Sequence, residues 1–237
     1  KLRVERGWGR AGIPVAQLAR PWGVAWRLGR IVLVRQAVGR MLCVFPFGPA
    51  IDADTGVKAT YIGHPLAEVI PLEPDREAAR LALGLPRQGH CLAVLPGSRR
   101  AEVKHLLATF LGAAALLVQR GLMAQVVVPI AHPGLRPLVL QAAAQYPELP
   151  LHLVDGQSHQ VMAACDLALV ASGTATLECA LFKRPMVIGY RLSALSYRLM
   201  VGRGYLPDVG LPNILAGERL VPELLQHDCT PQALADA

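Results

Sequence analysis

Several patterns that mark common functional sites are missing from this 237-residue sequence. The P-loop pattern GxxxxGK(S/T) does not occur, and no GxGxxG follows an apolar strand from residue 75 onward, which argues against a P-loop NTPase and against the common dinucleotide site. The five cysteines lack CxxC or Cys/His zinc spacing, so we expect no metal site. Asp52 and Asp54 stand in a polar loop that shows no sign of a pocket. No apolar run approaches the roughly 18–20 residues that span a bilayer.

Charged residues are also scarce, at 17%, whereas 53% of the residues are apolar. This composition is that of a globular protein and excludes disorder. The cysteines are odd in number and four of the five stand in apolar runs, so we expect buried free thiols in a reducing compartment. Because the chain opens on Lys1 with a basic stretch and no apolar signal core, we expect a fragment or a processed chain rather than a secreted precursor.

Acidic residues are nearly absent from the first forty residues, which hold nine Lys and Arg and only Glu5. The net charge of +7 is therefore concentrated there, interleaved with Trp8, Trp22 and Trp26. Cations beside tryptophans favour an anionic membrane surface. Nucleic acid is the competing partner, and a solvated arginine-rich face is a third interpretation. We expect the membrane surface and not nucleic acid.

The chain becomes regular after the proline-rich stretch 65–74, and we expect domains at 1–66 and 67–237. A helix over 75–83 is followed by apolar segments that alternate with helical patterns. The expected strands are 91–95, 124–130, 151–154, 167–170 and 186–190. Continuous apolar strands in such an alternation predict a doubly wound parallel α/β sheet, whose ligands bind at the carboxyl ends of the strands.

The turn after strand 91–95 reads Pro96-Gly97-Ser98-Arg99-Arg100. Gly97 allows the backbone to approach a ligand, Ser98 can cap the next helix, and Arg99 offers a planar fork for phosphate oxygens. The alternative is a tight turn with a capping serine and a solvated arginine.

The turn after strand 167–170 places Ser172, Gly173 and Thr174 at the start of an apolar helix. Small hydroxyl residues and a glycine at a helix N-terminus suit a diphosphate, because free amides and the helix dipole favour negative charge. Glu178, about one turn further on, can accept hydrogen bonds from the vicinal hydroxyls of a ribose. The alternative is an ordinary capped helix with a stabilising glutamate in its first turn.

Two further polar segments follow. The turn 155–158 presents Gln157 at the same expected edge of the sheet. Asn213, in Leu211-Pro212-Asn213, is a lone amide in an apolar segment and is either functional or only a turn former.

Six blocks of the sequence, taken together, resemble the lipid-A-disaccharide synthase family in order and spacing, with a match over residues 41–237. They are YIGHPLAE (61–68), LPGSRRAEV (95–103), DGQS (155–158), LVASGTATLECAL (169–181), KRPMVIGYR (183–191) and LPNILAGERLVPELLQ (211–226). The family resembles GT-B glycosyltransferases, which have two Rossmann-like domains. It transfers 2,3-diacylglucosamine from its UDP form to 2,3-diacylglucosamine 1-phosphate (lipid X), which gives the β-1,6 disaccharide of lipid A and UDP.

The resemblance implies a role for each candidate residue. Arg99 and Asn213 would take part in catalysis, and Glu178 would hold the ribose of the donor. The substrate-binding set would be Gly97, Ser98, Arg99, Gln157, Ser172, Gly173, Thr174, Glu178 and Asn213. The UDP-sugar is a substrate, so no cofactor is expected. The resemblance also implies a homodimer and a cytoplasmic location, peripheral to the inner membrane of a Gram-negative bacterium.

Parts of the family pattern are not present. The glycine-rich GExSGD-type loop and the aspartate proposed as general base are missing, and only the end of ARPWGVAWR (19–27) matches the family. We therefore expect residues 1–66 to be a remnant of the acceptor domain and the chain alone to be inactive. The alternatives are a nucleotide-sugar-binding module without catalysis, or another GT-B enzyme such as the peptidoglycan glucosaminyltransferase.

Overall fold

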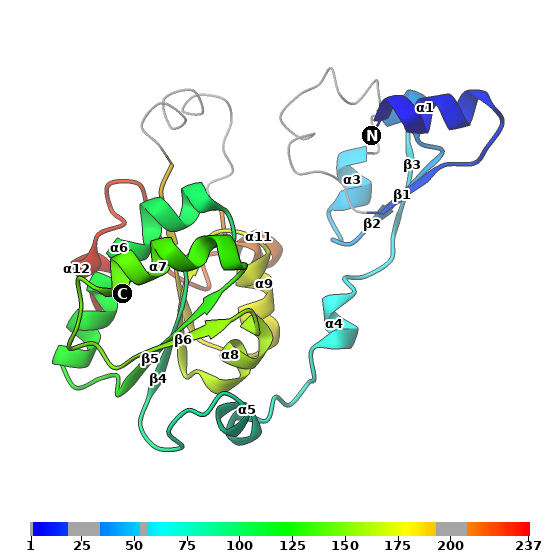
Figure 1. The fold of residues 1–237 in the computed structure, drawn as a ribbon. Helices are drawn as coiled ribbons and strands as arrows, with labels where there is room; N and C mark the ends of the chain where they lie inside the picture. The colour runs from blue at the N-terminus through cyan, green and yellow to red at the C-terminus, as the bar shows by residue number, and fades with distance from the viewer. Residues whose placement is uncertain (1, 19–33, 53–55, 193–207) are drawn as a thin grey trace. The chain divides into compact units, whose positions relative to one another are not determined.

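The computed structural model describes residues 2–18, 34–52, 56–192 and 208–237 (Figure 1). The chain divides into two compact units, Lys1–Val69 and Ile70–Ala237, and the boundary expected from the sequence followed residue 66. Trp22 and Trp26 lie outside the described residues.

The first unit holds a three-stranded parallel sheet in the order β1-β2-β3. Its elements are α1 (Leu2–Arg10), β1 (Ala16–Leu18), β2 (Arg40–Cys43), α3 (Gly48–Asp52), β3 (Lys58–Tyr61) and α4 (Leu66–Val69). Its small core contains Val38, Met41 and Val57. Gly7, Gly9 and Gly12 have GxGxxG spacing, but they lie in and just after α1. No strand-to-helix turn is formed there, so this spacing does not make a dinucleotide site.

The second unit is a six-stranded sheet in the order β6-β5-β4-β7-β8-β9, with every neighbouring pair parallel. The strands are β4 (Cys91–Leu95), β5 (Gln125–Ile130), β6 (Leu151–Asp155), β7 (Leu167–Ala171), β8 (Met186–Tyr190) and β9 (Glu223–Leu225). The five predicted strands are confirmed, and β9 was missed. The predicted doubly wound α/β sheet is therefore present.

Helices cover both faces of this sheet. Helices α6, α7 and α12 pack together on one face, whereas α5, α8, α9 and α11 form a second group (Figure 1). Their bounds are α5 (Arg76–Ala82), α6 (Arg100–Gln119), α7 (Arg136–Ala143, after a 3-10 turn at Pro133–Leu135), α8 (Ser158–Ala164), α9 (Thr174–Leu181), α11 (Leu211–Ala216) and α12 (Pro231–Asp236). Two covered faces explain why the central strands β4 and β7 are apolar along their whole length.

Helix α6 supplies much of the core. Its apolar residues recur in steps of three and four, and the face that this spacing makes is buried in full, with Val103, Leu106, Leu107, Phe110, Ala114 and Leu117 each at most 5% exposed. The helix is long and apolar enough to cross a membrane by composition. Its buried side chains, however, belong to the main core cluster with β4, β5 and β7, as in the core helix of a globular domain.

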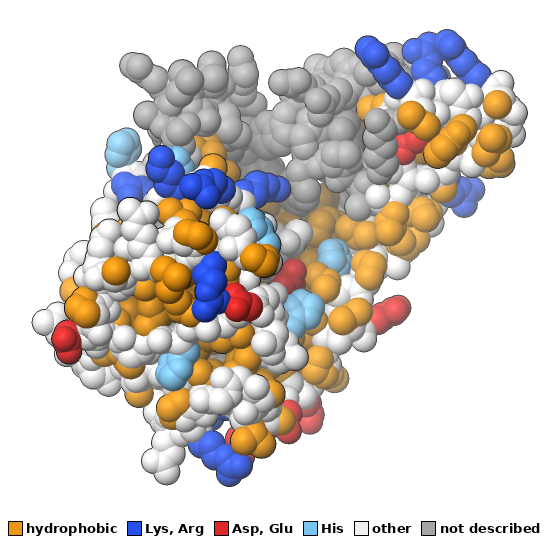
Figure 2. Space-filling model, viewed as in Figure 1, with side chains coloured by type: hydrophobic (Ala, Val, Ile, Leu, Met, Phe, Trp, Pro, Cys, Tyr) orange, Lys and Arg blue, Asp and Glu red, His pale blue; other side chains and the backbone are white. Residues whose placement is uncertain are grey.

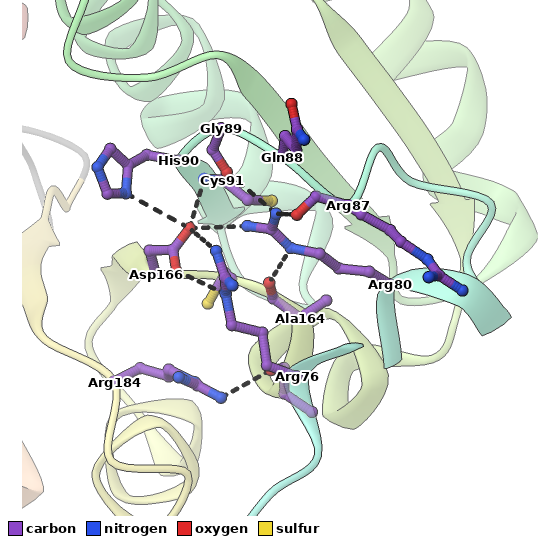
Figure 3. Close-up of polar contacts among 12 residues, drawn as sticks. Arg76, Arg80, Arg87, Gln88, Gly89, His90, Cys91, Ala164, Asp166 and Arg184 are labelled. Atoms are coloured by element: carbon purple, nitrogen blue, oxygen red, sulfur yellow. Dashed lines mark hydrogen bonds and ion pairs between the residues drawn. The ribbon is translucent and has the colours of Figure 1, made fainter. Parts of the chain in front are cut away.

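A buried arginine joins the amino ends of the two central strands. Arg80, in the last turn of α5, is 0% exposed. Its guanidinium donates to the carbonyls of Ala164 at 3.0 Å and Arg87 at 2.7 Å, and its Nη2 lies 2.7 Å from Asp166 Oδ2 (Figure 3). These bonds satisfy a charge that would otherwise be costly to bury.

Asp166 is the centre of this cluster. The same Oδ2 accepts from the amide of Cys91 at 2.8 Å, and Arg76 Nε lies 2.8 Å from Oδ1. Burial disfavours the charged carboxyl, but the bond from Cys91 and the bond and charge of Arg76 outweigh it and hold the pKa of Asp166 below its usual range. Because Cys91 begins β4 and Asp166 directly precedes β7, the cluster fastens these strands at one end.

We expect Asp166→Asn to lower the free energy of unfolding by about 3 kcal/mol at pH 7, because it leaves Arg80 buried without its counter-charge. Asp155→Asn is the matched control. Asp155 Oδ1 lies 2.6 Å from Arg136 Nη1, but the two side chains are 68% and 45% exposed. Its loss should cost at most about 1 kcal/mol. Urea unfolding followed by circular dichroism measures both variants, and equal losses would contradict the prediction.

The same comparison has a pH dependence. Since the pKa of Asp166 is lowered in the folded state, its contribution to stability is complete above the ordinary aspartate pKa. The difference between the unaltered chain and Asp166→Asn should therefore shrink as the pH falls below about 4. A difference that stays constant down to pH 2 would contradict this account.

All five cysteines are free and buried, as the sequence predicted. They are Cys43, Cys91, Cys165, Cys179 and Cys229. Burial raises the pKa of Cys91 to about 11 and that of Cys165 to about 12. Thiolates are the reactive form, so these groups are protected both by burial and by protonation.

We expect none of the five thiols to react with a water-soluble disulfide reagent at pH 8 while the chain is folded. All five should react once the chain is unfolded in guanidinium chloride. A photometric thiol titration counts them in both states. Rapid reaction of one or more thiols in the native state would show that the core opens locally.

Candidate functional site

The candidate site lies where the two central strands end. β4 and β7 are neighbours in parallel register, with Leu95 opposite Val170. From β4 the chain builds β5 and β6 on one side, and then returns to place β7 on the other side. Ligands of doubly wound sheets bind at such a change of direction, beyond the carboxyl ends of the strands. The turns 96–100 and 172–174 both emerge there, as predicted.

Gly97 gives the first turn its shape. Its φ of +105° disfavours any side chain, and an added Cβ would lie 2.5 Å from Glu102 Oε2. The Glu102 carboxylate, in the first turn of α6, thus folds back over Gly97. It accepts from the backbone amide of Arg99 at 3.2 Å. The expectation that Ser98 caps the helix is wrong, because the N-cap residue is Arg99 and Glu102 satisfies its amide.

Arg99 itself stands in solvent. Its side chain is 81% exposed, and Nη1 lies 2.6 Å from Glu102 Oε1. An ion pair this exposed contributes little to stability, so the guanidinium can exchange Glu102 for another anion at small cost. Ser98 is exposed beside it. Both residues are therefore accessible to a ligand at the carboxyl edge.

The second turn exposes the start of a helix. Gly173, the N-cap of α9, has φ +154° and ψ −162°, a conformation that is nearly restricted to glycine. Among the described residues, its chain neighbours aside, none has an atom within 4 Å of where its Cβ would be, and Thr174 is exposed next to it. Ser172 Oγ donates to the carbonyl of Val209 at 2.8 Å. The amides of Thr174 and Ala175, the first two of α9, have no acceptor within the helix, and such amides suit an anion.

Glu178 lies in the second turn of α9. It is therefore not the first-turn glutamate that would stabilise the helix through its dipole. Its side chain is 17% exposed, and Oε2 lies 3.3 Å from His159 Nε2 on α8. The ring of His159 packs against Phe182 with centroids 5.5 Å apart. Sequence reasoning missed His159, because only the packing of α8 beside α9 brings it to Glu178.

Gln157 is less close to the other candidates. It is exposed at the N-cap of α8 with φ +54°, directly after β6. β5 separates β6 from β4, so the turn is displaced from the Gly97 turn by two strand spacings, roughly 10 Å. Gln157 therefore lies at the same edge of the sheet as the Gly97 and Gly173 turns, but it is not adjacent to them.

For Asn213 the structure differs from the prediction made from the sequence. It is 0% exposed, and its Nδ2 donates to Val221 O at 2.9 Å and to Glu223 Oε1 at 2.7 Å. Its Oδ1 accepts from the amides of Leu220 at 2.9 Å and Val221 at 3.0 Å. A side-chain amide has two donors and two acceptor positions, so all four are used inside the protein. The geometry leaves no group for the substrate contact or the catalytic role expected from the sequence.

Within the ranges that the structure describes, no three His, Cys, Asp or Glu side chains come close enough to share a metal ion. The two turns and α9 offer instead amide donors, the guanidinium of Arg99 and the partly buried carboxylate of Glu178. These groups match a diphosphate and a sugar diol better than they match a cation.

Comparison with known sequences shows one family. The family model for lipid-A-disaccharide synthetase matches residues 20–237. The lipid-A-disaccharide synthase of Cupriavidus pinatubonensis is 54% identical over 226 residues, which cover 95% of this chain and 56% of the relative. That of Burkholderia vietnamiensis is 53% identical over 236 residues, or 100% of this chain and 61% of the relative. The chain thus spans about three fifths of the curated relatives that it matches.

Two solved structures share the fold. HepE of Anabaena, crystallised with UDP and glucose, has a TM-score of 0.55 at 14% identity and covers 99% of this chain and 64% of its own. The wall teichoic acid polymerase TagF has a TM-score of 0.52 at 13% identity and covers 88% and 50%. At these identities the likeness concerns the fold, and the expected α/β architecture of the GT-B type is confirmed.

Proposed function

The chain belongs to the lipid-A-disaccharide synthase family, and from this membership we propose that it takes part in the transfer reaction of lipid A synthesis. The reaction moves 2,3-diacylglucosamine from its UDP form to 2,3-diacylglucosamine 1-phosphate and releases UDP. The observation that carries the proposal within the structure is the meeting of the Gly97 and Gly173 turns beyond β4 and β7. We assign unit Ile70–Ala237 to the donor nucleotide.

The donor would be held by its diphosphate and its ribose. The amides at the start of α9 and the guanidinium of Arg99 are donors for phosphate oxygens, with Ser172 and Thr174 beside them. Glu178 has a carboxylate that is largely withdrawn from water, and it would accept hydrogen bonds from the two ribose hydroxyls. Gly97, Ser98 and Gln157 complete the proposed binding surface.

The chemistry divides into two tasks. The acceptor 6-hydroxyl attacks the anomeric carbon, a base takes its proton, and the bond from that carbon to the UDP oxygen breaks with inversion. The electron pair leaves with UDP, so positive groups near the diphosphate stabilise the transition state. Arg99 and the α9 amides are proposed for this second task. No described residue at the edge is assigned as the base.

We expect the chain to bind UDP, and Arg99→Ala and Glu178→Ala each to weaken binding by about 1–3 kcal/mol, the range for a lost hydrogen bond to a charged group. Arg136→Ala is the control for Arg99, since Arg136 is also an exposed arginine paired with an acid at this edge. Isothermal titration calorimetry gives the affinities.

The two variants should lose affinity for different parts of UDP. Arg99→Ala should affect UDP but not uridine, because uridine has no phosphate. Glu178→Ala should affect UDP but not its 2′,3′-dideoxy analogue, because that analogue has no diol. Unchanged UDP affinity in both variants would leave Arg99 as a solvated side chain and Glu178 as a structural partner of His159.

We also propose that helix α1 contacts an anionic membrane surface, at the inner membrane of a Gram-negative cell. Arg3, Arg6 and Arg10 lie on one side of the helix, and Val4 and Trp8 lie one turn apart on another. Val4 is 54% and Trp8 51% exposed. Figure 2 shows Lys and Arg side chains and hydrophobic side chains at the surface over α1. Cationic and apolar faces side by side are typical of helices that lie in the membrane interface.

The chain should bind vesicles that contain phosphatidylglycerol, and salt should release it, because screening weakens attraction between surface charges. Arg6→Glu should weaken binding about 10-fold or more, since each basic residue contributes about 1 kcal/mol. Arg87→Glu, an exposed arginine of the other unit, is the matched control. Sedimentation with vesicles measures both. Equal binding to neutral vesicles would contradict the electrostatic account.

A further inference from the structure

Glu223 is a buried carboxylate in the second unit that the proposed chemistry does not use. It begins β9 and is 8% exposed. Its Oε2 accepts from the amide of Val209 at 2.8 Å, and its Oε1 accepts from the amide of Gly210 at 2.9 Å. Oε1 also accepts from Asn213 Nδ2 at 2.7 Å. Three neutral N–H groups thus hold this carboxylate in place.

These bonds fix a segment whose backbone amides at 209 and 210 bond to a side chain. The amides of Val209 and Gly210, just before α11, find their acceptors on one side chain and not in a sheet. Asn213, which donates to Glu223, also accepts hydrogen bonds from the backbone amides at 220 and 221. At Gly210 an added Cβ would lie 2.3 Å from Ile188 Cδ1 and 2.8 Å from Glu223 Oε1, so the segment packs closely against β8 and Glu223.

Thr176 connects the segment before α11 to the turn at Gly173. It is 0% exposed, and its Oγ1 accepts from the amide of Leu211 at 3.2 Å and donates to the carbonyl of Gly173 at 2.8 Å. Ser172 Oγ makes a parallel link to the carbonyl of Val209 at 2.8 Å. The start of α11 and the start of α9 are therefore tied together through two hydroxyl groups.

The bond to the Gly173 carbonyl sets the direction of an amide. In a trans peptide the C=O and the N–H of the next residue point in opposite directions. The Gly173 carbonyl is held toward Thr176 by the hydroxyl and also by the Thr176 amide at 3.2 Å, so the N–H of Thr174 points away from the helix. A donor whose direction is fixed before the ligand arrives binds an anion without reorganisation.

We propose that Glu223, Asn213 and Thr176 are positioning residues, which hold the turn 172–174 with its amides directed at the donor diphosphate. The inference rests on the proposed function and gives Asn213 a task that needs no contact with substrate. A buried polar network with every group satisfied selects one arrangement of the chain, and here that arrangement ends at the phosphate-binding turn.

Thr176→Val tests the proposal, because valine keeps the shape of threonine and removes both hydrogen bonds. Thr176→Ser is the rescue variant, since it keeps the hydroxyl. Calorimetry with UDP and ligand-observed NMR with uridine give two affinities for each chain. We expect Thr176→Val to bind UDP about 10-fold more weakly and uridine within about twofold of the unaltered chain, and Thr176→Ser to restore UDP binding.

Glu223→Gln is the second variant, which keeps the side-chain shape and one acceptor oxygen if Thr176→Val does not fold. It should show the same selective loss for UDP, with an unchanged circular dichroism spectrum. Equal weakening for UDP and uridine, or no weakening, would overturn the positioning role. If the unaltered chain bound no UDP, the proposed function itself would fail, and this inference with it.

Discussion

The parallel pairing of β4 with β7 is the constraint on which the second unit depends. Parallel neighbours cannot be joined by a tight turn, so the chain between them must cross over through helices, and those helices bury both faces of the sheet. The pairing also gives the two strands a common direction. Their amino ends meet at Asp166 and Arg80, and their carboxyl ends meet at Gly97 and Gly173. The buried ion-pair cluster and the proposed ligand site are thereby placed at opposite edges of the same strand pair.

The two edges use charge differently. At the amino edge Arg80 is sealed from water, and every bond it makes is internal. At the carboxyl edge Arg99 is exposed and keeps only one acidic neighbour. A buried ion pair resists exchange because each partner would be left uncompensated, whereas an exposed pair exchanges easily. The same residue type therefore joins two strands at one edge and is accessible to solvent at the other.

The sequence predicted what depends on local pattern. The buried face of α6 follows from steps of three and four, and the central strands follow from continuous apolar runs. Strand β9 was missed because three residues that begin with a glutamate carry no strand signal. Arg80 was missed because its partner lies 86 positions away. Asn213 was recognised as unusual, but the direction of its amide depends on Leu220, Val221 and Glu223, and spacing alone does not reveal it.

Glu102 has a consequence for how an anion would enter the site. In the chain as it stands, its carboxylate occupies the place beside the Arg99 guanidinium and covers Gly97. A phosphate that reaches Arg99 takes over a position already held by a negative group, so its arrival is an exchange of counter-ions and not the pairing of a bare cation. The net gain in electrostatic free energy is smaller for an exchange. In the reverse direction Glu102 can pair with the guanidinium again, which would favour release of a bound anion.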